Sequence, residues 1–211
     1  STNTLGTSNF IAGVNAGNSI TSGGNYNTVV GDEAGTAITT GDDNTSVGYK
    51  AGYALTTGTN NVLIGGNAGD AITTGTDNVA LGRASLTSDT LGQSSVAIGH
   101  QALFSQNFTS ATNAYNVAVG KNAGLALSTG TNNTLIGGLA GDANTTASNN
   151  TAVGYASLGA NTTGTSNVAL GAYALDANTT ASNNTAIGRG ALTANTTGTQ
   201  NTAVGSFSLD A

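Results

Sequence analysis

The chain has 211 residues, including 32 Gly and no Pro, Cys, Met or Trp, and only 7% of it is charged, against about 25% in average globular chains. A net charge of −6 with four Lys and Arg excludes the cation clusters that nucleic-acid binding needs. The absence of Cys excludes disulfides and thiolate metal sites, and no run of about 18 apolar residues is present to span a membrane. The chain starts at Ser1 without a basic-then-apolar leader, which favours a piece of something longer.

A motif of the form Asn-(Thr/Val)-x-(Val/Ile/Leu)-Gly recurs through the whole chain. Its glycines mark twelve copies of a 17-residue unit, with one extra residue after the first copy and four extra after the sixth. We therefore expect residues 1–211 to form a single repeat array, with a four-residue insertion within 104–115, as a fragment of a longer fibre. The motif glycines are Gly13, Gly31, Gly48, Gly65, Gly82, Gly99, Gly120, Gly137, Gly154, Gly171, Gly188 and Gly205.

Each unit combines short β-branched runs with Gly punctuation, and helical spacing is not sustained across it. This pattern fits two short strands and two turns per unit. Because the chain has no Pro, every backbone N–H remains free to join a ladder. The sequence therefore predicts an all-β fold, a parallel β-solenoid (β-roll) of twelve 17-residue coils.

Two positions of the unit compensate each other in side-chain volume. Where the residue four after the motif Gly is Leu, the residue seven after it is polar, as in Leu158 and Asn161. Where the earlier residue is Gly, the later one is Ile or Leu, as in Gly35 and Ile38. The eighth copy departs from this rule, and there we expect Leu139 to supply the missing volume. Such compensation is what close packing demands, so the pattern indicates a folded array rather than low complexity.

Asn stands four residues before the motif Gly in every copy except the sixth, which has Ser95. Stacked amides satisfy buried polar groups between identical rungs, so we expect a structural ladder along the array. Its members are Asn9, Asn27, Asn44, Asn61, Asn78, Asn116, Asn133, Asn150, Asn167, Asn184 and Asn201.

The strand before the motif Gly is apolar on both sides, as in residues 151–153. We expect one side to fill the coil interior. The other side, mostly Ala with Ile11, Val29, Leu63 and Leu135, then needs a cover. We expect further copies of the chain to cover it in a closed homo-oligomer around a shared axis. A monomeric solenoid with an exposed Ala face is the alternative.

The segments Ser94–His100 and Asn150–Gly154 resemble the head repeats of trimeric autotransporter adhesins, and Asn195–Gly205 is similar to repeats of phage tail fibres and bacterial fibre proteins. The resemblance covers essentially the whole chain, although the period of 17 is longer than in the adhesins. It implies a homotrimeric β-roll in an extracellular fibre, on a cell surface or a virion, that serves as an adhesive head or a spacer.

No catalytic constellation is apparent in the sequence. His100 is the only His, and its neighbours Gln101 and Ser105 supply no acid. The position after the motif Gly varies freely between copies, which is typical of a solvated surface site. We therefore expect no enzyme activity, no catalytic residue, no cofactor and no metal site.

Two alternatives remain open for the function. The Thr-rich half of each unit, such as Thr56–Thr59, would stack into ladders that resemble the ice-binding faces of antifreeze solenoids, although Thr next to Gly is also typical of turns. This predicts an ice- or carbohydrate-binding solenoid that acts through a Thr/Asn face. A more distant alternative is a calcium-dependent surface-layer module with a site near Asp32, Glu33, Asp42 and Asp43.

Aromatic residues near the motif Gly and in the insertion are candidates for contact with a glycan or protein of a host or prey surface. Covering the edge of the roll is their alternative role. The candidates are Phe104, Phe108, Tyr115, Tyr49, Tyr155 and Tyr173.

Overall fold

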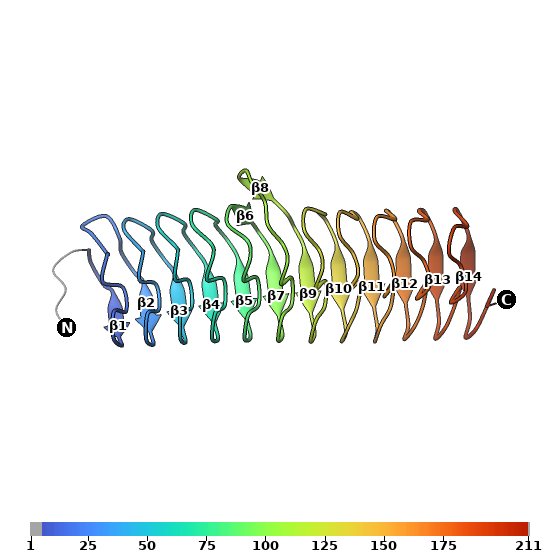
Figure 1. Ribbon diagram of the computed structural model, residues 1–211, viewed down its shortest axis with the longest axis horizontal. Helices are drawn as coiled ribbons and strands as arrows, with labels where there is room; N and C mark the ends of the chain where they lie inside the picture. Colours follow the sequence, from blue (N-terminus) through green and yellow to red (C-terminus); the bar gives the residue numbers. More distant parts are fainter. Residues whose placement is uncertain (1–5, 211) are drawn as a thin grey trace.

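The computed structural model describes residues 6–210, which wind as a straight rod of stacked coils (Figure 1). Residues 1–5 and 211 of the predicted array lie outside the described residues. Fourteen strands and no helix form between residues 6 and 210. The protein is therefore all-β, as its sequence predicts.

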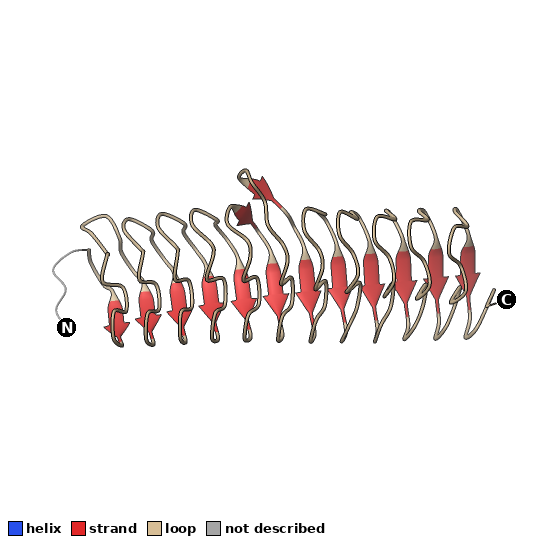
Figure 2. Cartoon of the chain, viewed as in Figure 1, coloured by secondary structure: helices blue, strands red, loops and turns tan. Residues whose placement is uncertain are grey.

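Twelve three-residue strands form one parallel sheet along the whole rod (Figure 2). Neighbouring strands pair in register one coil apart, so that Val62 lies opposite Val79. The prediction of a parallel β-solenoid is confirmed. With a strand spacing of about 4.8 Å, twelve rungs and the eleven turns between them extend over about 53 Å. The strands are β1 (Phe10–Ala12), β2 (Thr28–Val30), β3 (Thr45–Val47), β4 (Val62–Ile64), β5 (Val79–Leu81), β7 (Val96–Ile98), β9 (Val117–Val119), β10 (Thr134–Ile136), β11 (Thr151–Val153), β12 (Val168–Leu170), β13 (Thr185–Ile187) and β14 (Thr202–Val204).

The expectation of two strands per unit is wrong for most of the array. The Thr-rich half of the coil is bent, and the positive φ of 59° at Asn60 turns the chain before a ladder can extend. Its backbone still bonds between coils, since the Thr56 N–H donates to the Thr73 carbonyl at 2.8 Å. Within residues 6–210, only β6 (Gly92–Gln93) and β8 (Thr112–Asn113) add a second sheet, at the insertion.

The motif glycine lies where each strand turns into the next side of the coil. At Gly65, φ is 131°, and a Cβ would lie only 2.6 Å from the carbonyl oxygen of Gly82 in the next coil. Any side chain there would separate the two coils, which explains why Gly recurs at this position.

The core is a narrow line of Ala and larger aliphatic side chains that runs from Ala16 to Ala203. Both members of the compensating pair lie in it, because Leu158 and Ile38 are fully buried. The expectation for Leu139 is wrong, since it is only half-buried and has a positive φ of 59°. Leu135 fills the eighth coil instead, and a Cβ at Gly141 would lie 2.8 Å from its Cδ2.

Candidate functional surfaces

The first and third residues of each strand in the long sheet point away from the coil, and we call their surface the outer sheet face. The middle residues are buried, including Val29, Leu63 and Leu135, except for Ile11 in the first rung, which is partly buried. The expectation that this Ala-rich side faces outward is therefore wrong. The coil is so thin that Ala, with an occasional Leu or Val, fills its interior, and the bulkier residue before the motif Gly is turned outward.

The outer sheet face carries no charged residue. Its third-residue row is apolar along the whole rod, whereas its first-residue row holds Thr in six strands and Val or Phe in the other six. The more exposed members of the third-residue row include Leu81, at 44% exposure, and Leu170, at 41%. Contiguous apolar surface of this length marks an interaction site in a folded protein. The row before the motif Gly is Ala12, Val30, Val47, Ile64, Leu81, Ile98, Val119, Ile136, Val153, Leu170, Ile187 and Val204.

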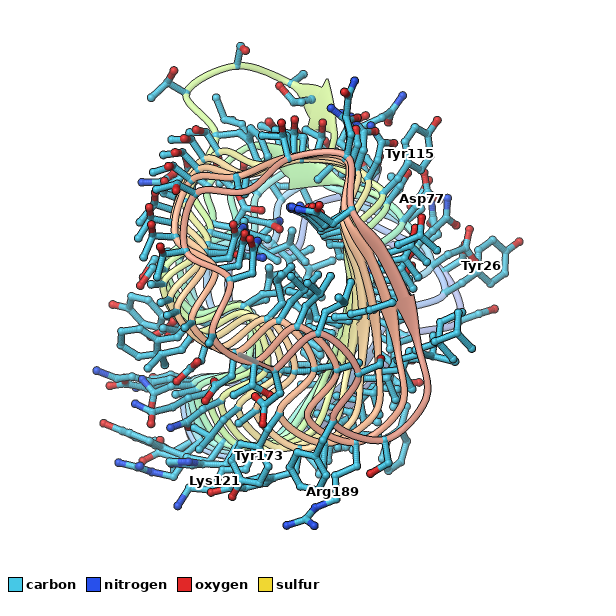
Figure 3. All side chains as sticks on the ribbon, turned by 90° about the vertical axis from the view of Figure 1, so that its right-hand side faces the viewer. Tyr26, Asp77, Tyr115, Lys121, Tyr173 and Arg189 are labelled. Carbon is cyan, nitrogen blue, oxygen red and sulfur yellow. The ribbon has the colours of Figure 1, made fainter. Side chains whose placement is uncertain are left out.

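Two polar edges flank the outer sheet face. The upstream edge consists of the residues five before the motif Gly, and it holds the acids Asp43 and Asp77. The downstream edge consists of the two residues after the motif Gly. Figure 3 shows Tyr26, Asp77 and Tyr115 on one side of the sheet and Lys121 and Arg189 on the other. The downstream edge holds every Lys, Arg and His of the chain: Lys50, Arg83, His100, Lys121 and Arg189.

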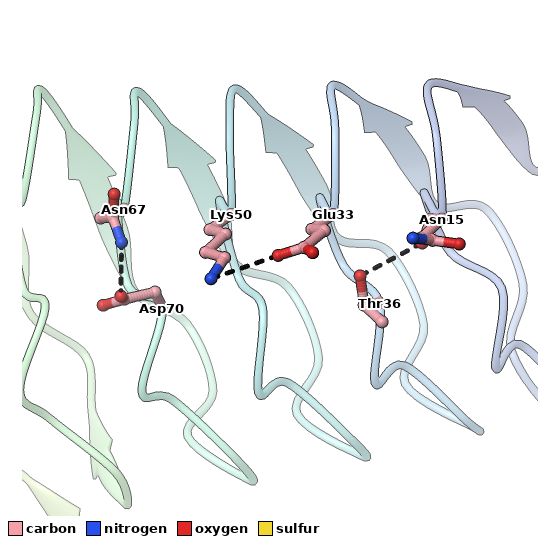
Figure 4. A network of polar contacts seen from close by, with 6 residues as sticks. All are labelled: Asn15, Glu33, Thr36, Lys50, Asn67 and Asp70. Carbon is pink, nitrogen blue, oxygen red and sulfur yellow. Dashed lines mark hydrogen bonds and ion pairs between the residues drawn. The ribbon is translucent and has the colours of Figure 1, made fainter.

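Polar contacts tie the downstream edge together between coils (Figure 4). The Lys50 ammonium lies 3.2 Å from the Glu33 carboxylate, and this hydrogen bond raises the pKa of Lys50. The same ammonium lies over the ring of Tyr53, 5.2 Å from its centroid. Within the fourth coil, the Asn67 amide donates to Asp70, three residues further along the chain, at 2.9 Å. These contacts show that much of the edge is occupied by its own side chains.

The predicted aromatic contact residues fall into two groups. Tyr49, Tyr115, Tyr155 and Tyr173 are exposed, and the last two form an edge-to-face pair with ring centroids 5.5 Å apart. Phe108, by contrast, is only 6% exposed, so its prediction as a surface contact is wrong. It lies within the insertion, where its backbone N–H donates to the buried Asp89 carboxylate. Phe104 is half-buried.

A buried polar cluster lies at the insertion, and the sequence analysis missed it. The Asp89 carboxylate is fully buried and accepts from Gln106 at 2.6 Å and from the Gly92 and Phe108 N–H groups at 3.0 and 3.2 Å. Burial raises the pKa of Asp89. The one available signal was the substitution of polar residues for Ile or Leu seven after the motif Gly in the fifth and sixth copies.

The Asn row before the strands forms a continuous hydrogen-bond chain in each half of the rod. The Asn44 amide donates to Asn27 at 3.1 Å and to the Gly58 carbonyl at 2.9 Å, and its oxygen accepts from Asn61. These groups are fully buried, so the amides replace water as partners for the backbone.

At Ser95, the Asn row is bridged by a residue of the insertion. Gln106 donates to the Ser95 hydroxyl at 2.9 Å and accepts from the Asn116 amide at 2.9 Å. The longer loop therefore delivers a Gln that fills the place of the missing Asn.

The Thr row nine residues after the end of each strand has its own internal role. The Thr56 hydroxyl donates to the Thr73 carbonyl at 3.0 Å, and Thr162 does the same to Thr179. The insertion strand β8 pairs with Gly92–Gln93, two residues beyond Thr90 of this row, and stands above the line of coils (Figure 1). A flat ice surface would therefore be held away from the middle of the Thr row.

The four clustered acids of the calcium alternative do not converge. Asp32 and Glu33 lie after a motif Gly, on the downstream edge, and Asp42 and Asp43 lie just before the next strand, across the outer sheet face from them. Among residues 6–210, no group of three or more His, Cys, Asp or Glu is placed to hold a metal ion.

The one His does not meet an acid in the structure. The nearest polar contact of the His100 ring is the guanidinium of Arg83, at 3.2 Å. A hollow of about 330 Å³ lies against the open end of the last coil, lined by Leu192, Asn195 and Leu209 among others. It is the end of the coil interior, and it brings together no acid–base pair.

Comparison with known proteins gives no relative. No protein-family model, no curated protein and no solved structure matches the chain. The described residues contain no helix that is long and apolar enough to cross a membrane.

Proposed function

We propose that the protein is a non-enzymatic, rod-shaped segment of an extracellular trimeric fibre, acting as a spacer or as an adhesive head on a cell surface or virion. The observation that carries this proposal is the outer sheet face, an uncharged surface with an unbroken apolar row before the motif Gly along a rod of twelve rungs. A rod sets a distance, and an apolar row along its full length gives it a means of bundling with copies of itself.

The size of the surface supports assembly. A three-residue strand is about 10 Å long, so the outer sheet face covers about 500 Å² over the length of the rod. With the two flanking edges it reaches about 1,000 Å² per copy, compared with about 800 Å² per partner in a standard stable interface. The number three comes from the resemblance of the repeats to trimeric adhesins and fibres.

The adhesive variant of this proposal rests on the exposed aromatic residues. Tyr49, Tyr155 and Tyr173 are exposed on the downstream edge, at the rim of the proposed interface and away from the centre of the outer sheet face. The adhesive variant requires that these rings stay partly accessible in the bundle. Their partner would be a glycan or a protein of a host or prey surface.

The test is the mass of the purified 211-residue chain by light scattering over a hundredfold range of concentration. We expect three chain masses, and we expect the Leu81→Lys/Leu170→Lys variant to dissociate because it places charges in the apolar face. Thr57→Lys/Thr163→Lys, on the opposite Thr-rich side, is the matched control and should remain assembled. A monomeric parent chain at every concentration would refute the proposal.

A further inference from the structure

The outer sheet face and its edges also carry information about how two copies face each other. All cations of the chain lie on the downstream edge, whereas the upstream edge has only the acids Asp43 and Asp77 and otherwise neutral residues. The outer sheet face between them is uncharged. The downstream edge also holds the acids Asp32 and Glu33 after β2, so its four cations leave it a formal net charge of +2 against −2 on the upstream edge. The two edges are therefore opposite in net charge.

The positions of these charges along the rod match coil by coil. Asp77 precedes strand β5 and Arg83 follows it, while Asp43 precedes β3 and Lys50 follows it. At the level of β9, Lys121 faces across the sheet from Tyr115, whose ring and hydroxyl both suit a cation. No rung of residues 6–210 carries like charges on both edges.

Within a single chain these partners do not meet. Six residues and the whole width of the strand separate Asp77 from Arg83, and neither Asp77 nor Asp43 has an ion-pair partner among the described residues. Both Asp77 and Arg83 are exposed. Asp43, Asp77 and Arg83 are therefore free of an ion-pair partner within the described residues, whereas the Lys50 ammonium is held by Glu33 of its own chain at 3.2 Å.

Symmetry then selects the arrangement. Rotation about an axis parallel to the rod, as in any parallel cyclic assembly, brings the downstream edge of one copy against the upstream edge of the next at the same coil level. An antiparallel pair packed through the same face instead brings like edges together, with cations facing cations. Rim charges of this kind set orientation and register more than they set affinity.

Resting on the proposed function, we propose that the outer sheet face is an interface between parallel, in-register copies of this chain, with its register set by Arg83 pairing with the neighbour's Asp77. The occupant is a second copy of the same rod, because it alone presents the complementary edge, the same apolar rows and the same spacing over the full length.

The first test is a charge exchange in the full 211-residue chain. Arg83→Asp and Asp77→Arg each create repulsion at every interface of the ring, so each should raise the dissociation constant at least about tenfold, or about 1.4 kcal/mol. The double variant Asp77→Arg/Arg83→Asp recreates the pair with reversed sign and should return to within about threefold of the parent. Arg189→Asp, which faces the neutral Asn183, is the matched control and should have a much smaller effect.

The second test measures orientation directly. Because the chain has no Cys, a nitroxide label attached at Val204→Cys, in the last rung, is the only label on each copy. The distance between labels on neighbouring copies then reports their relative orientation. Parallel in-register rods bring the labels within about 20 Å of one another, whereas antiparallel rods separate them by about the 53 Å length of the array. A long separation, or a double charge variant no tighter than the single ones, would overturn this inference while leaving assembly intact. A parent chain that stays monomeric would instead refute the proposed function on which this inference rests.

Discussion

The two halves of the rod fill the same narrow coil in different ways. The first four coils and the seventh have Gly four residues after the motif Gly and Ile or Leu seven after it, as in Gly35 and Ile38. We call these the aliphatic coils. The ninth to eleventh coils have Leu and Asn instead, as in Leu175 and Asn178, and we call these the amide coils.

Each solution has a different energetic weakness. The earlier position is left-handed in both types, with φ of 50° at Gly35 and 53° at Leu175. Gly adopts this conformation freely, whereas Leu stores about 1 kcal/mol of strain. In return, the amide coils gain a second internal ladder, in which the Asn178 amide donates to Asn161 at 2.9 Å and to the Ala181 carbonyl at 3.0 Å. The fold of the coil therefore constrains the side-chain volume inside it and the number of hydrogen bonds that must be satisfied, and it leaves the residue types variable.

The boundary between the two types leaves a visible defect. Asn144 accepts from Asn161, but its own amide nitrogen is buried without a partner. One coil earlier, the same position is occupied by Leu127, which has no acceptor to offer. At this change of coil type one donor is therefore left without a partner, whereas Gln106, next to the aliphatic seventh coil, donates to Asp89 and Ser95.

The largest expected effect is on the Asn row that both coil types share. Asn44→Ala in the aliphatic half and Asn167→Ala in the amide half should each lower the free energy of unfolding by about 3 kcal/mol, because buried donors and acceptors lose their partners. Urea denaturation measures both. If only one of the two variants lost stability, the Asn row would not stabilise both types of coil.

A double-mutant cycle tests directly whether the two coil types are interchangeable. Leu175→Gly leaves a cavity and Asn178→Ile overfills the coil, and each should cost about 3 kcal/mol. Together they rebuild an aliphatic coil, so the double variant should cost about 2 kcal/mol less than the sum. The mirror exchange, Gly35→Leu with Ile38→Asn, is the matched control. Strict additivity in both cycles would contradict volume compensation.

A smaller gain is expected at an unpaired hydroxyl in an aliphatic coil. The Ser46 hydroxyl is buried and has no hydrogen-bond partner, while the same position is Ala in most coils, for example Ala80. Ser46→Ala should therefore raise the free energy of unfolding by about 1 kcal/mol. A loss of stability on thermal or urea unfolding would show that the hydroxyl has a partner after all.

The smallest expected effect is a dependence on pH from the insertion that joins the halves. Burial raises the pKa of Asp89 above its usual 3.8, so the folded state binds this proton more tightly than the unfolded state. Its contribution to stability is full below pH 3.8 and is lost as the pH rises through the raised pKa. Asp142 and Asp176 shift in the same direction, also through burial.

Urea midpoints between pH 4 and pH 7 measure this slope, and Asp89→Asn should flatten it. An unchanged slope in that variant would assign the dependence to the other two carboxyl groups.

Sequence periodicity was sufficient for the solenoid, its period and its compensating pair, because these depend on spacing alone. It did not show which side of the strand is internal, because the alternation of side chains assigns residues to two faces without showing which face points into the coil. The signal was present, because Asn44 and Ser46 share a side and a buried amide row places that side inside. The Gln106 bridge depends on where a longer loop returns in space, which spacing does not encode.

Small-angle X-ray scattering of the 211-residue chain tests the central claim most directly, because it reports length and mass per unit length together. A rod that bundles through its outer sheet face in parallel register should keep a length of about 53 Å while its mass per unit length is three times that of one chain. A mass per unit length equal to one chain would contradict the account.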